Sequence, residues 1–595
     1  MGKEDNNINH IDIEAMRMGK QLNLEQREYL TRNITEDDII KALRGIGNLK
    51  APGLDGYGAK FFKASWTTIK TDVIAAIRDF FEIGKIYKPF NNVVVSLIPK
   101  SNEACEIKDY RPIDVCTIFY KIISKILTGR LGYVLPSVIS HNQAVFIQGQ
   151  NIHNHIMLAT EIIKGYTRKG GTPRIMMQID LQKAYDMVNW KALEFIMKEL
   201  GIPNKFIQWT MLGITTVSYR FNIMGGYTEV LQAKRGIQQG DPLSPLLFVL
   251  IMDYMNRLLV KMQRDPNFNY HAKCESLKIT NLTFADDILL LCRGDEISMK
   301  MMLETFRNFS KSTGLMMNPN KCKIYFGGLD METRKRLKEL SGFQEGALSV
   351  KYLGIPLTSK RLTITHFMPL VDKIVARIHH WSSRLLNYAG RIQLVKSIAY
   401  AMVQYWMHCL PLPKYVIKKV DAICRSFIWS GKDTASRKCP VAWKTTCRPA
   451  AQGGMNILNL QIWNNVLLLK CLWNLCNKTD TIWVKWIHTQ YLKGNNVMNY
   501  VPKPHNSWIM RGILKQRDNM DLIRYEWNQA MTMRKFKATT FYKILIDDGT
   551  RVHWRRLIGY NKGHLRAVQC LWQACHAKLA TKERLKCFGV IEDII

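Results

Sequence analysis

The chain has 595 residues, which is long enough for several domains, and its 47% of hydrophobic residues excludes general disorder. Its 85 Lys and Arg residues outnumber 48 Asp and Glu, and the resulting net charge of +37 favours a polyanionic partner, nucleic acid above all. The longest apolar run, residues 246–252, is too short to cross a bilayer, no secretory signal pattern is present, and the 14 cysteines are too scattered for a disulfide framework. Neither membrane insertion nor secretion is therefore expected.

The first 90 residues are expected to form an N-terminal extension and the start of the first domain. Thr35 begins a helix in capping-box style, with Asp38 in its first turn and apolar residues at 39–43. The stretch Lys50-Ala51-Pro52-Gly53-Leu54-Asp55-Gly56 then ends this helix, and on its own it is a plain turn.

A β-hairpin is predicted next. Residues 93–100 are rich in β-branched and apolar side chains and predict a strand, and Arg111 follows after a polar loop. Lys100 and Arg111 therefore lie on either side of the hairpin loop, where isolated cations are ordinarily solvated surface charges. An amphipathic basic helix at 120–131 and the segment at 142–150 come after this hairpin.

An apolar strand at 175–179 runs directly into Asp180, a place where an acid is not needed for solubility. Tyr185 follows five residues later, at the start of a helix that is predicted to continue through Trp190 to Leu200. A core aromatic is the plain interpretation of Tyr185, and Asp186 is expected to be structural.

Glycine and proline punctuate the loop at 234–245, which leads into an apolar helix at 246–255. Gly240 follows Gln239 in this loop, and a glycine there would let a ligand approach the backbone closely. A tight turn in the loop is an equally good reason for Gly240.

Two adjacent acids, Asp286 and Asp287, stand between apolar runs that predict the strands of a second hairpin at 282–291. Adjacent carboxylates repel each other and resist desolvation, so a cation should compensate them, most simply a hard divalent ion with oxygen ligands. The alternative is a solvated Asp-Asp turn, since aspartate is an ordinary turn residue. The third acid, Asp180, favours the metal interpretation.

These three features follow one another in the order found in the palm of template-directed polymerases. The sequence resembles the reverse transcriptases of non-LTR (LINE-type) retrotransposons, and the plant branch in particular. Asp180 matches the family's first catalytic aspartate, residues 235–245 its RG-x-x-QGDPLSP loop, and residues 284–287 its FADD box. The resemblance implies an α+β right-hand polymerase, with fingers, a palm built on a small antiparallel sheet and a thumb, followed by a mostly helical, Trp-rich C-terminal region.

The resemblance also implies the metal ligands of an RNA-directed DNA polymerase. Asp180, Asp286 and Asp287 would hold two Mg²⁺ ions, with Mn²⁺ as an alternative, for phosphoryl transfer to a DNA 3′ end. Lys321, at the end of the motif-like stretch 314–321, resembles the lysine that approaches the departing pyrophosphate.

The nucleotide would be bound by five further residues. Lys100 and Arg111 resemble the finger residues that grip its triphosphate, a task suited to charge-assisted hydrogen bonds. Tyr185 resembles the residue beneath its sugar that excludes ribonucleotides. Gln239 and Gly240 match the loop residues that pack against the nucleotide and the template base.

The same resemblance divides the rest of the chain into fingers and palm at 91–358, a helical thumb at 359–428 and a Trp-rich region at 429–595. Residues 350–357 resemble the primer-grip hairpin, and the thumb helices would follow a primer-template duplex through sequence-blind contacts. The tryptophans of the last region are expected to lie mostly in its core: Trp429, Trp443, Trp463, Trp473, Trp483 and Trp486. Four residues near the end fit no standard zinc spacing, and no zinc is expected: Cys570, Cys575, His576 and Cys587.

The expected partners are an RNA template, a DNA primer or target, deoxynucleoside triphosphates and a separate endonuclease, because family members commonly carry an endonuclease upstream. The expected location is the nucleus or a cytoplasmic ribonucleoprotein, although residues 334–338 are only a weak import signal. Leu54, Gln148 and Gln150 depart from the family's usual Pro, Pro and Arg, so a catalytically decayed or domesticated nucleic-acid-binding remnant is the alternative. An intron maturase is a further alternative, but no RNA-splicing segment is recognisable.

Overall fold

The chain forms two compact units. The computed structural model describes residues 9–101, 103–140, 142–143, 149, 151–168, 170–223, 225–382, 386–432, 439–546, 549–559, 565–579, 581–582 and 586. The first unit consists of Met1–His155 and Gly165–Val350, and the second of Ile156–Lys164 and Lys351–Ile595. The chain therefore crosses between the units three times, because residues 156–164 belong to the second unit although both flanking stretches belong to the first.

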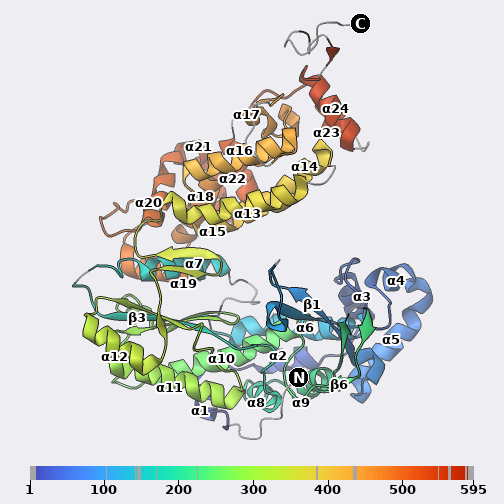
Figure 1. The fold of residues 1–595 in the computed structure, drawn as a ribbon, viewed down its shortest axis with the longest axis vertical. Coiled ribbons are helices and arrows are strands. Elements are labelled where there is room, and N and C mark those ends of the chain that lie inside the picture. The colour runs from blue at the N-terminus through green and yellow to red at the C-terminus, as the bar shows by residue number, and fades with distance from the viewer. Residues whose placement is uncertain are drawn as a thin grey trace. The chain divides into compact units, whose positions relative to one another are not determined.

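Two five-stranded sheets organise the first unit (Figure 1). The palm sheet has the order β10-β9-β3-β8-β7, and its neighbouring strands are antiparallel except for the parallel pair β10 and β9. The predicted small antiparallel sheet is therefore present, with one short parallel strand added at its edge. Its strands are β3 (Arg174–Asp180), β7 (Asn281–Phe284), β8 (Asp287–Arg293), β9 (Lys323–Gly327) and β10 (Gln344–Glu345).

The other sheet, which we call the fingers sheet, contains the first predicted hairpin. Strands β1 and β2 are antiparallel, with Pro99 opposite Tyr110, which confirms that hairpin. Strand β4 lies parallel to β1 on its other side and pairs with both β5 and β6. Its strands are β1 (Asn92–Pro99), β2 (Tyr110–Val115), β4 (Ser218–Ile223), β5 (Gly226–Tyr227) and β6 (Leu231–Gln232).

The apolar helix predicted at 246–255 is the centre of the first unit. Helix α10 extends beyond that prediction at both ends, and all residues at 246–255 are buried, since this stretch is apolar on nearly every face. Figure 1 shows α10 and α11 on one side of the palm sheet, and α10 also packs against α1 and α8. The helices of this unit are α1 (Ile13–Met18), α2 (Leu24–Thr31), α3 (Glu36–Arg44), α4 (Ala59–Ala64), α5 (Trp66–Ile83), α6 (Ile118–Val138), α8 (Trp190–Glu199), α9 (Asn204–Thr215), α10 (Ser244–Met262), α11 (Glu296–Thr313) and α12 (Met331–Ser341).

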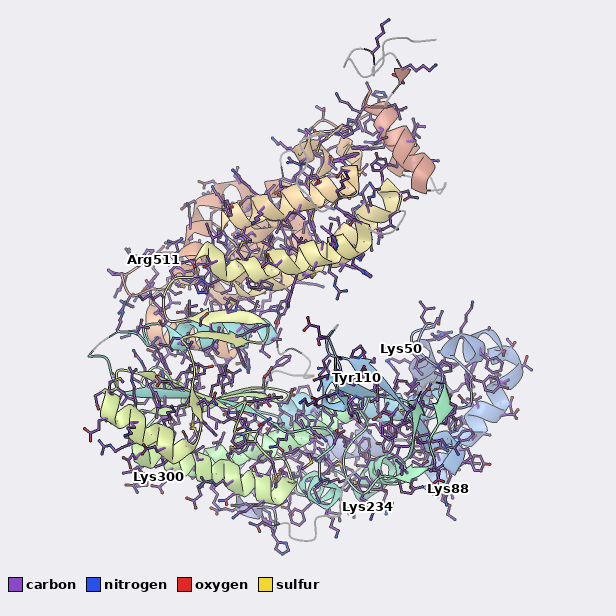
Figure 2. All side chains as sticks on the ribbon, viewed as in Figure 1. Lys50, Lys88, Tyr110, Lys234, Lys300 and Arg511 are labelled. Carbon is purple, nitrogen blue, oxygen red and sulfur yellow. The ribbon has the colours of Figure 1, made fainter. Side chains whose placement is uncertain are left out.

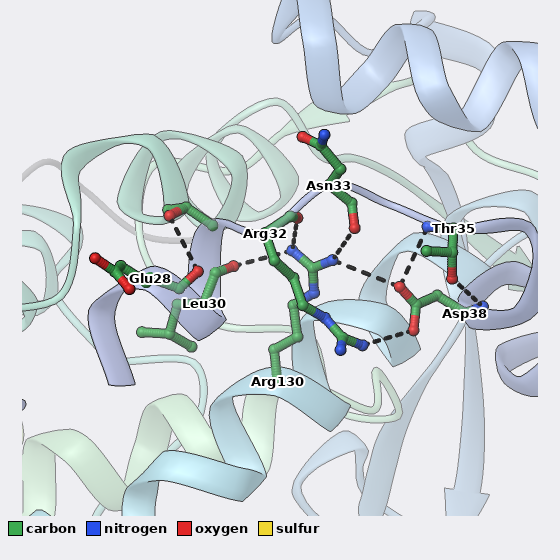
Figure 3. Close-up of polar contacts among 8 residues, drawn as sticks. Glu28, Leu30, Arg32, Asn33, Thr35, Asp38 and Arg130 are labelled. Atoms are coloured by element: carbon green, nitrogen blue, oxygen red, sulfur yellow. Dashed lines mark hydrogen bonds and ion pairs between the residues drawn. The ribbon is translucent and has the colours of Figure 1, made fainter. Parts of the chain in front are cut away.

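One buried arginine fastens the N-terminal helices to α6 (Figure 3). The Arg130 guanidinium donates hydrogen bonds to the carbonyl oxygens of Leu30 (3.0 Å), Arg32 (2.7 Å) and Asn33 (3.1 Å), at the C-terminal end of α2 and just beyond it. It also lies 3.6 Å from the carboxylate of Asp38, in the first turn of α3. The predicted capping box of α3 is present, because the side chains of Thr35 and Asp38 bond each other's backbone N–H groups.

The described residues of the second unit form helices apart from a single hairpin. That hairpin, formed by β11 (Ser349–Tyr352) and β12 (Ile355–Thr358), is the one predicted at 350–357 and begins at the boundary with the first unit. Helix α13 packs on α16, α16 on α18, and α18 on α20 and α22. The α-helices of the unit are α7 (Ile152–Ile163), α13 (Ile364–Ser382), α14 (Tyr388–Leu394), α15 (Tyr400–Cys409), α16 (Lys414–Ser430), α17 (Trp443–Thr446), α18 (Leu460–Cys476), α19 (Ile482–Ile487), α20 (Trp508–Leu514), α21 (Met520–Thr532), α22 (Ala538–Leu545), α23 (Arg555–Gly559) and α24 (Leu565–Cys575).

Four of the six tryptophans expected in the core are buried, and Trp443 and Trp463 are half-buried. Within the described ranges no helix is both long enough and apolar enough to cross a membrane.

Helix α7 is held in the second unit by a buried carboxylate. Glu161 is fully buried and accepts hydrogen bonds from the hydroxyl groups of Tyr491 (2.6 Å) and Ser507. The apolar side chains at 156, 158, 162 and 163 are also fully buried, so this helix is a core element of the unit.

Candidate active site

Strand pairing brings two of the three predicted metal ligands together. Asp180, the last residue of β3, lies opposite Asp287, the first residue of β8. Strands β7 and β8 are joined by a turn of only two residues, Ala285 and Asp286, in which Ala285 has φ +51°. All three aspartates therefore lie at one end of the palm sheet. This agrees with the predicted strand that ends at Asp180 and with the predicted hairpin at 282–291.

The electrostatics of this cluster indicate a place for a cation. Burial, together with the neighbouring charges of Asp286 and Asp180, raises the pKa of Asp287 to about 6. Asp286 itself is exposed. No group of three or more Asp, Glu, His or Cys side chains in the described part of the chain could hold a metal ion on its own. An ion here would consequently need oxygen atoms from phosphates or water as well, which is how Mg²⁺ is commonly bound.

Lys321 is the only sequence-predicted cation with an ion-pair contact to these aspartates among the described residues. Its Nζ lies 3.7 Å from Oδ2 of Asp180, and both side chains remain substantially exposed. The segment after α11 brings it there, because Asn318 N–H donates to the carbonyl of Asp180 (2.8 Å) and Leu181 forms a bridge with Met317. The motif-like stretch at 314–321 is thus part of the aspartate site.

Tyr185 lies near the aspartates, but the prediction that it begins a helix is wrong. Its ring stacks on Phe248 of α10, with 5.1 Å between the ring centroids, and burial together with the charge of Asp286 raises the pKa of its hydroxyl to about 12. Helix α8 begins only at Trp190, where Asn189 caps it by accepting a hydrogen bond from Ala192 N–H. The residues between β3 and α8 form turns instead, because their carbonyl groups are bonded to the glycine-rich loop.

The first half of that loop is fastened to the chain after β3. Gly236 N–H donates to the carbonyl of Val188 (2.8 Å), Ile237 N–H donates to that of Tyr185 (2.9 Å), and Trp190 Nε1 donates to the carbonyl of Gly236 (2.6 Å). Gly236 has φ +93°, and a Cβ there would lie 2.9 Å from the carbonyl oxygen of Asp186. Both conditions explain why glycine is needed at this position.

The second half of the loop is fastened to the fingers sheet. Gln239 and Asp114 of β2 form two hydrogen bonds, one from Asp114 N–H to the carbonyl of Gln239 (2.8 Å) and one from Gln239 N–H to Oδ2 of Asp114 (2.6 Å). A Cβ on Gly240, where φ is +138°, would lie 2.6 Å from the carbonyl oxygen of Asp114. Gly240 therefore allows β2 and the loop to approach each other.

Buried side chains complete this attachment. Gln238 is 1% exposed, and its amide contacts Cys116 Sγ and Asn91 Oδ1, each at 3.5 Å. Asp241 is also buried and accepts hydrogen bonds from the Ser124 hydroxyl and from the backbone N–H of Leu243 (3.2 Å) at the start of α10.

Asp114 is a residue that the sequence analysis missed. Burial raises its pKa to about 7, and the charges of Asp186 and Asp241 act in the same direction, although the hydrogen bond from Gln239 opposes them. Burial also raises the pKa of Asp241 to about 6. No local signal marked Asp114, because its partner in the loop lies 125 residues away.

Lys100 and Arg111 lie on the fingers hairpin and are exposed. Lys100 Nζ donates a hydrogen bond to the carbonyl of Lys108 (2.6 Å), so it lies back over the hairpin loop. The structure brings neither residue into an ion pair with the three aspartates among the described residues.

The segment that follows α6 reaches the aspartate hairpin. Thr283 N–H in β7 donates to the carbonyl of Asn142 (3.1 Å), and Gln143 forms a bridge with Thr283. Gln148 and Gln150, which depart from the family pattern, lie outside the described residues.

A strand that ends in an acid, a hairpin with two more acids and a glycine-rich loop joined to both the palm and fingers sheets define the palm of a template-directed polymerase. Residues 98–357 match the family described as reverse transcriptase (RNA-dependent DNA polymerase). Over these residues the chain is similar to reverse transcriptases, and among its relatives are proteins named as parts of retrotransposable elements. Reverse transcriptases generally depend on divalent metal ions. The finer placement in the plant branch stays a prediction.

Three relatives support this assignment. The Transposon TX1 uncharacterized 149 kDa protein of Xenopus laevis is 24% identical over 73% of this chain and 32% of its own length. The retrovirus-related Pol polyprotein from the type-1 retrotransposable element R2 of Popillia japonica is 27% identical over 49% of this chain and 39% of its own length. The retrovirus-related Pol polyprotein from the type-2 retrotransposable element R2DM of Drosophila melanogaster is 23% identical over 76% of this chain and 41% of its own length. The chain spans about a third to two fifths of the length of these relatives.

Proposed function

We propose that this chain extends a DNA 3′ end on an RNA template, as the RNA-directed DNA polymerase of a non-LTR retroelement. The observation that carries the proposal is the position of Asp180 opposite Asp287 across β3 and β8, with Asp286 in the adjoining turn. The reverse transcriptase match over residues 98–357 supports it, because that stretch contains both catalytic strands and the loop between them.

Asp180, Asp286 and Asp287 fit a pair of Mg²⁺ ions, with Mn²⁺ as an alternative. Burial raises the pKa of Asp287 most, and repulsion from the carboxylates of Asp286 and Asp180 adds to it, so a divalent cation here would favour the ionised carboxylates. When bound, such ions supply activation of the primer 3′-hydroxyl and neutralisation of the triphosphate.

The remaining residues of the site orient the nucleotide. Lys100 and Arg111 would bind its phosphates, and Tyr185, held against Phe248, would lie beneath its sugar and exclude a 2′-hydroxyl. Gln239 and Gly240 would contact the base pair, because the loop that carries them is fixed to β2. Lys321, beside Asp180, would stabilise the departing pyrophosphate.

The helices of residues 359–428 are proposed as a thumb that follows the primer-template duplex, and residues 429–595 as a separate C-terminal region. The proposed partners are an RNA template, a DNA target, deoxynucleoside triphosphates and an endonuclease that supplies the 3′ end. The proposed location is the nucleus. Residues 334–338, the weak import signal, lie in α12.

The test is extension of a DNA primer on an RNA template by the full chain with Mg²⁺ and deoxynucleotides, beside the Asp286→Asn variant. Asp286 is exposed in a turn, so the substitution should abolish synthesis and preserve both folding and affinity for the hybrid. Asp72→Asn, which changes an exposed aspartate on α5, is the matched control and should retain full activity. Synthesis by Asp286→Asn would contradict the assignment.

A nucleic-acid-binding remnant is the second candidate, favoured by Leu54, Gln148 and Gln150, which depart from the family pattern. The same experiment separates the two. Hybrid binding without synthesis by the folded wild-type chain would favour the remnant, whereas synthesis by wild type alone would make these three substitutions tolerated variations.

A further inference from the structure

The positive charge of the chain is concentrated in its C-terminal part. Residues 351–595 contain 39 Lys and Arg against 12 Asp and Glu, whereas residues 1–350 contain 46 against 36. Exposed cations occur on both units, among them Lys50, Lys88, Lys234 and Lys300 on the first and Arg511 on the second (Figure 2). The excess in the C-terminal part is much larger than solubility requires.

Helix α21, in this cationic region, has one anchored face. Ile523, Trp527 and Ala530 are buried, and the carbonyl of Ala530 accepts a hydrogen bond from Trp473 Nε1 of α18 (3.3 Å). This anchorage fixes which side of α21 faces solvent.

A side of α21 that adjoins this anchored face carries an exposed apolar row of side chains. Leu522, Tyr525 and Met533 are 71%, 74% and 68% exposed, and Gln529 between them is exposed as well. Their spacing of three, four and four residues places them in one row, roughly 16 Å long at the rise of an α-helix. Large exposed side chains grouped in this way mark binding surfaces more often than isolated ones do.

Three cations come after this row in the chain. Arg534, Lys535 and Lys537 are exposed and have no carboxylate partner in the part of the chain that the structure describes, while α21 itself carries the half-buried acid Glu526 beside the row. Arg524 lies beside Tyr525 and is paired with Asp521 at 2.8 Å, but both side chains are so exposed that this pair is weak and easily exchanged.

We propose that Leu522, Tyr525, Gln529 and Met533, with the cations at 534–537, bind single-stranded RNA at a site separate from the aspartates. An exposed aromatic ring bordered by cations matches the chemistry of single-strand binding, in which a base stacks on the ring and the phosphates meet the cations. A protein partner would fit the apolar row, but it gives no reason for the exposed cations that have no acidic partner among the described residues. The proposal does not depend on polymerase activity.

The test is the affinity of the full chain for a labelled oligouridylate of about twenty nucleotides, measured by fluorescence anisotropy without nucleotides. Tyr525→Ala should weaken binding by about fivefold or more. Tyr525→Phe should preserve binding because it keeps the ring, and Tyr525→Leu should lose it although the position stays apolar. Lys535→Gln combined with Lys537→Gln should reduce the dependence of affinity on salt.

Unchanged RNA affinity in both Tyr525→Ala and Tyr525→Leu would overturn the proposal. Sedimentation of the same proteins tests whether a second copy of the chain binds this surface instead of RNA. If Tyr525→Leu alters self-association and leaves RNA affinity intact, a second copy of the chain occupies the surface and the proposal is wrong. Thermal unfolding of each variant should match wild type, since Tyr525 is exposed, so a loss of affinity reports on binding.

Discussion

Asp114 makes the attachment between the fingers sheet and the glycine-rich loop sensitive to pH. Free aspartate loses its proton near pH 3.8, whereas burial holds the proton on Asp114 up to a pH of about 7. The folded state therefore binds an additional proton in this window, and the stability that Asp114 contributes is present at low pH and lost as the pH rises through about 7.

The substitution Asp114→Asn tests the direction of this pH dependence. The asparagine keeps an oxygen that can accept the hydrogen bond from Gln239 N–H and carries no charge, so the variant should gain stability relative to wild type between about pH 5 and about pH 8. The gain should not exceed a few kcal/mol, since one pKa unit corresponds to about 1.4 kcal/mol. Thermal unfolding of both proteins at the two pH values measures this gain. If the stabilities of wild type and variant change equally between the two pH values, the proposed role of Asp114 is wrong.

Gly240 should tolerate no side chain. Gly240→Ala would place a Cβ 2.6 Å from the carbonyl oxygen of Asp114 and displace the loop from β2, so primer extension should fall by roughly 10- to 100-fold. Gly342→Ala is the control, because Gly342 also has positive φ (+69°) but open space around it. That control should lose about 1 kcal/mol of stability and keep its activity. Equal activity of both variants would show that the contact with Asp114 has no role.

The sequence revealed residues whose chemistry is unusual for their local setting. Asp180 at the end of an apolar strand and Asp286 and Asp287 in an apolar hairpin were visible in this way, and strand pairing then brought them together. Asp114 was not visible, because an acid in an edge hairpin is unremarkable until its distant partner in the loop is known.

At the scale of elements, the junction of α2 and α3 depends on one guanidinium group. Arg130→Met would remove the donor shared by the carbonyl groups of Leu30, Arg32 and Asn33 and leave Asp38 with only its pair to Arg32. The loss of stability should be about 3 kcal/mol, because the lost bonds are buried.

Arg32→Met is the matched control for this arginine, since Arg32 contacts the same carboxylate from an exposed position. It should cost less than about 1 kcal/mol. Chemical denaturation gives both values, and faster hydrogen exchange at residues 30–44 in the Arg130 variant would locate the effect. A smaller loss for Arg130→Met than for Arg32→Met would show that the buried bonds are not stabilising.

Local patterns predicted most elements, and the failure at α8 shows their limit. The capping box of α3 and both hairpins depend on residues close in sequence, so the sequence contained the whole interaction. The start of α8 depends on the carbonyl groups of Tyr185 and Val188, which bond the loop at 236–237 instead of continuing a helix. Helical periodicity carries no information about a distant loop that takes these hydrogen bonds instead.

At the scale of the molecule, the two units should not separate cleanly. A fragment ending at residue 350 would retain α7 and lose its surroundings, including the hydroxyl groups of Tyr491 and Ser507 that bond Glu161. We expect this fragment to aggregate when produced alone, and to be recovered in soluble form, bound to residues 351–595, when the two are produced together. Co-purification through a tag on either fragment measures this, and two soluble, unassociated fragments would contradict it.

The position of α7 also imposes an order on synthesis. Glu161 and Tyr491 are 330 residues apart, so at the usual rate of chain elongation α7 leaves the ribosome roughly 15 to 70 s before its partner exists. During that interval the apolar side of α7 stays uncovered by the residues of its own unit. The nascent chain should therefore depend on a chaperone that shields this one helix, and a shortage of such help should lower the yield of the whole protein.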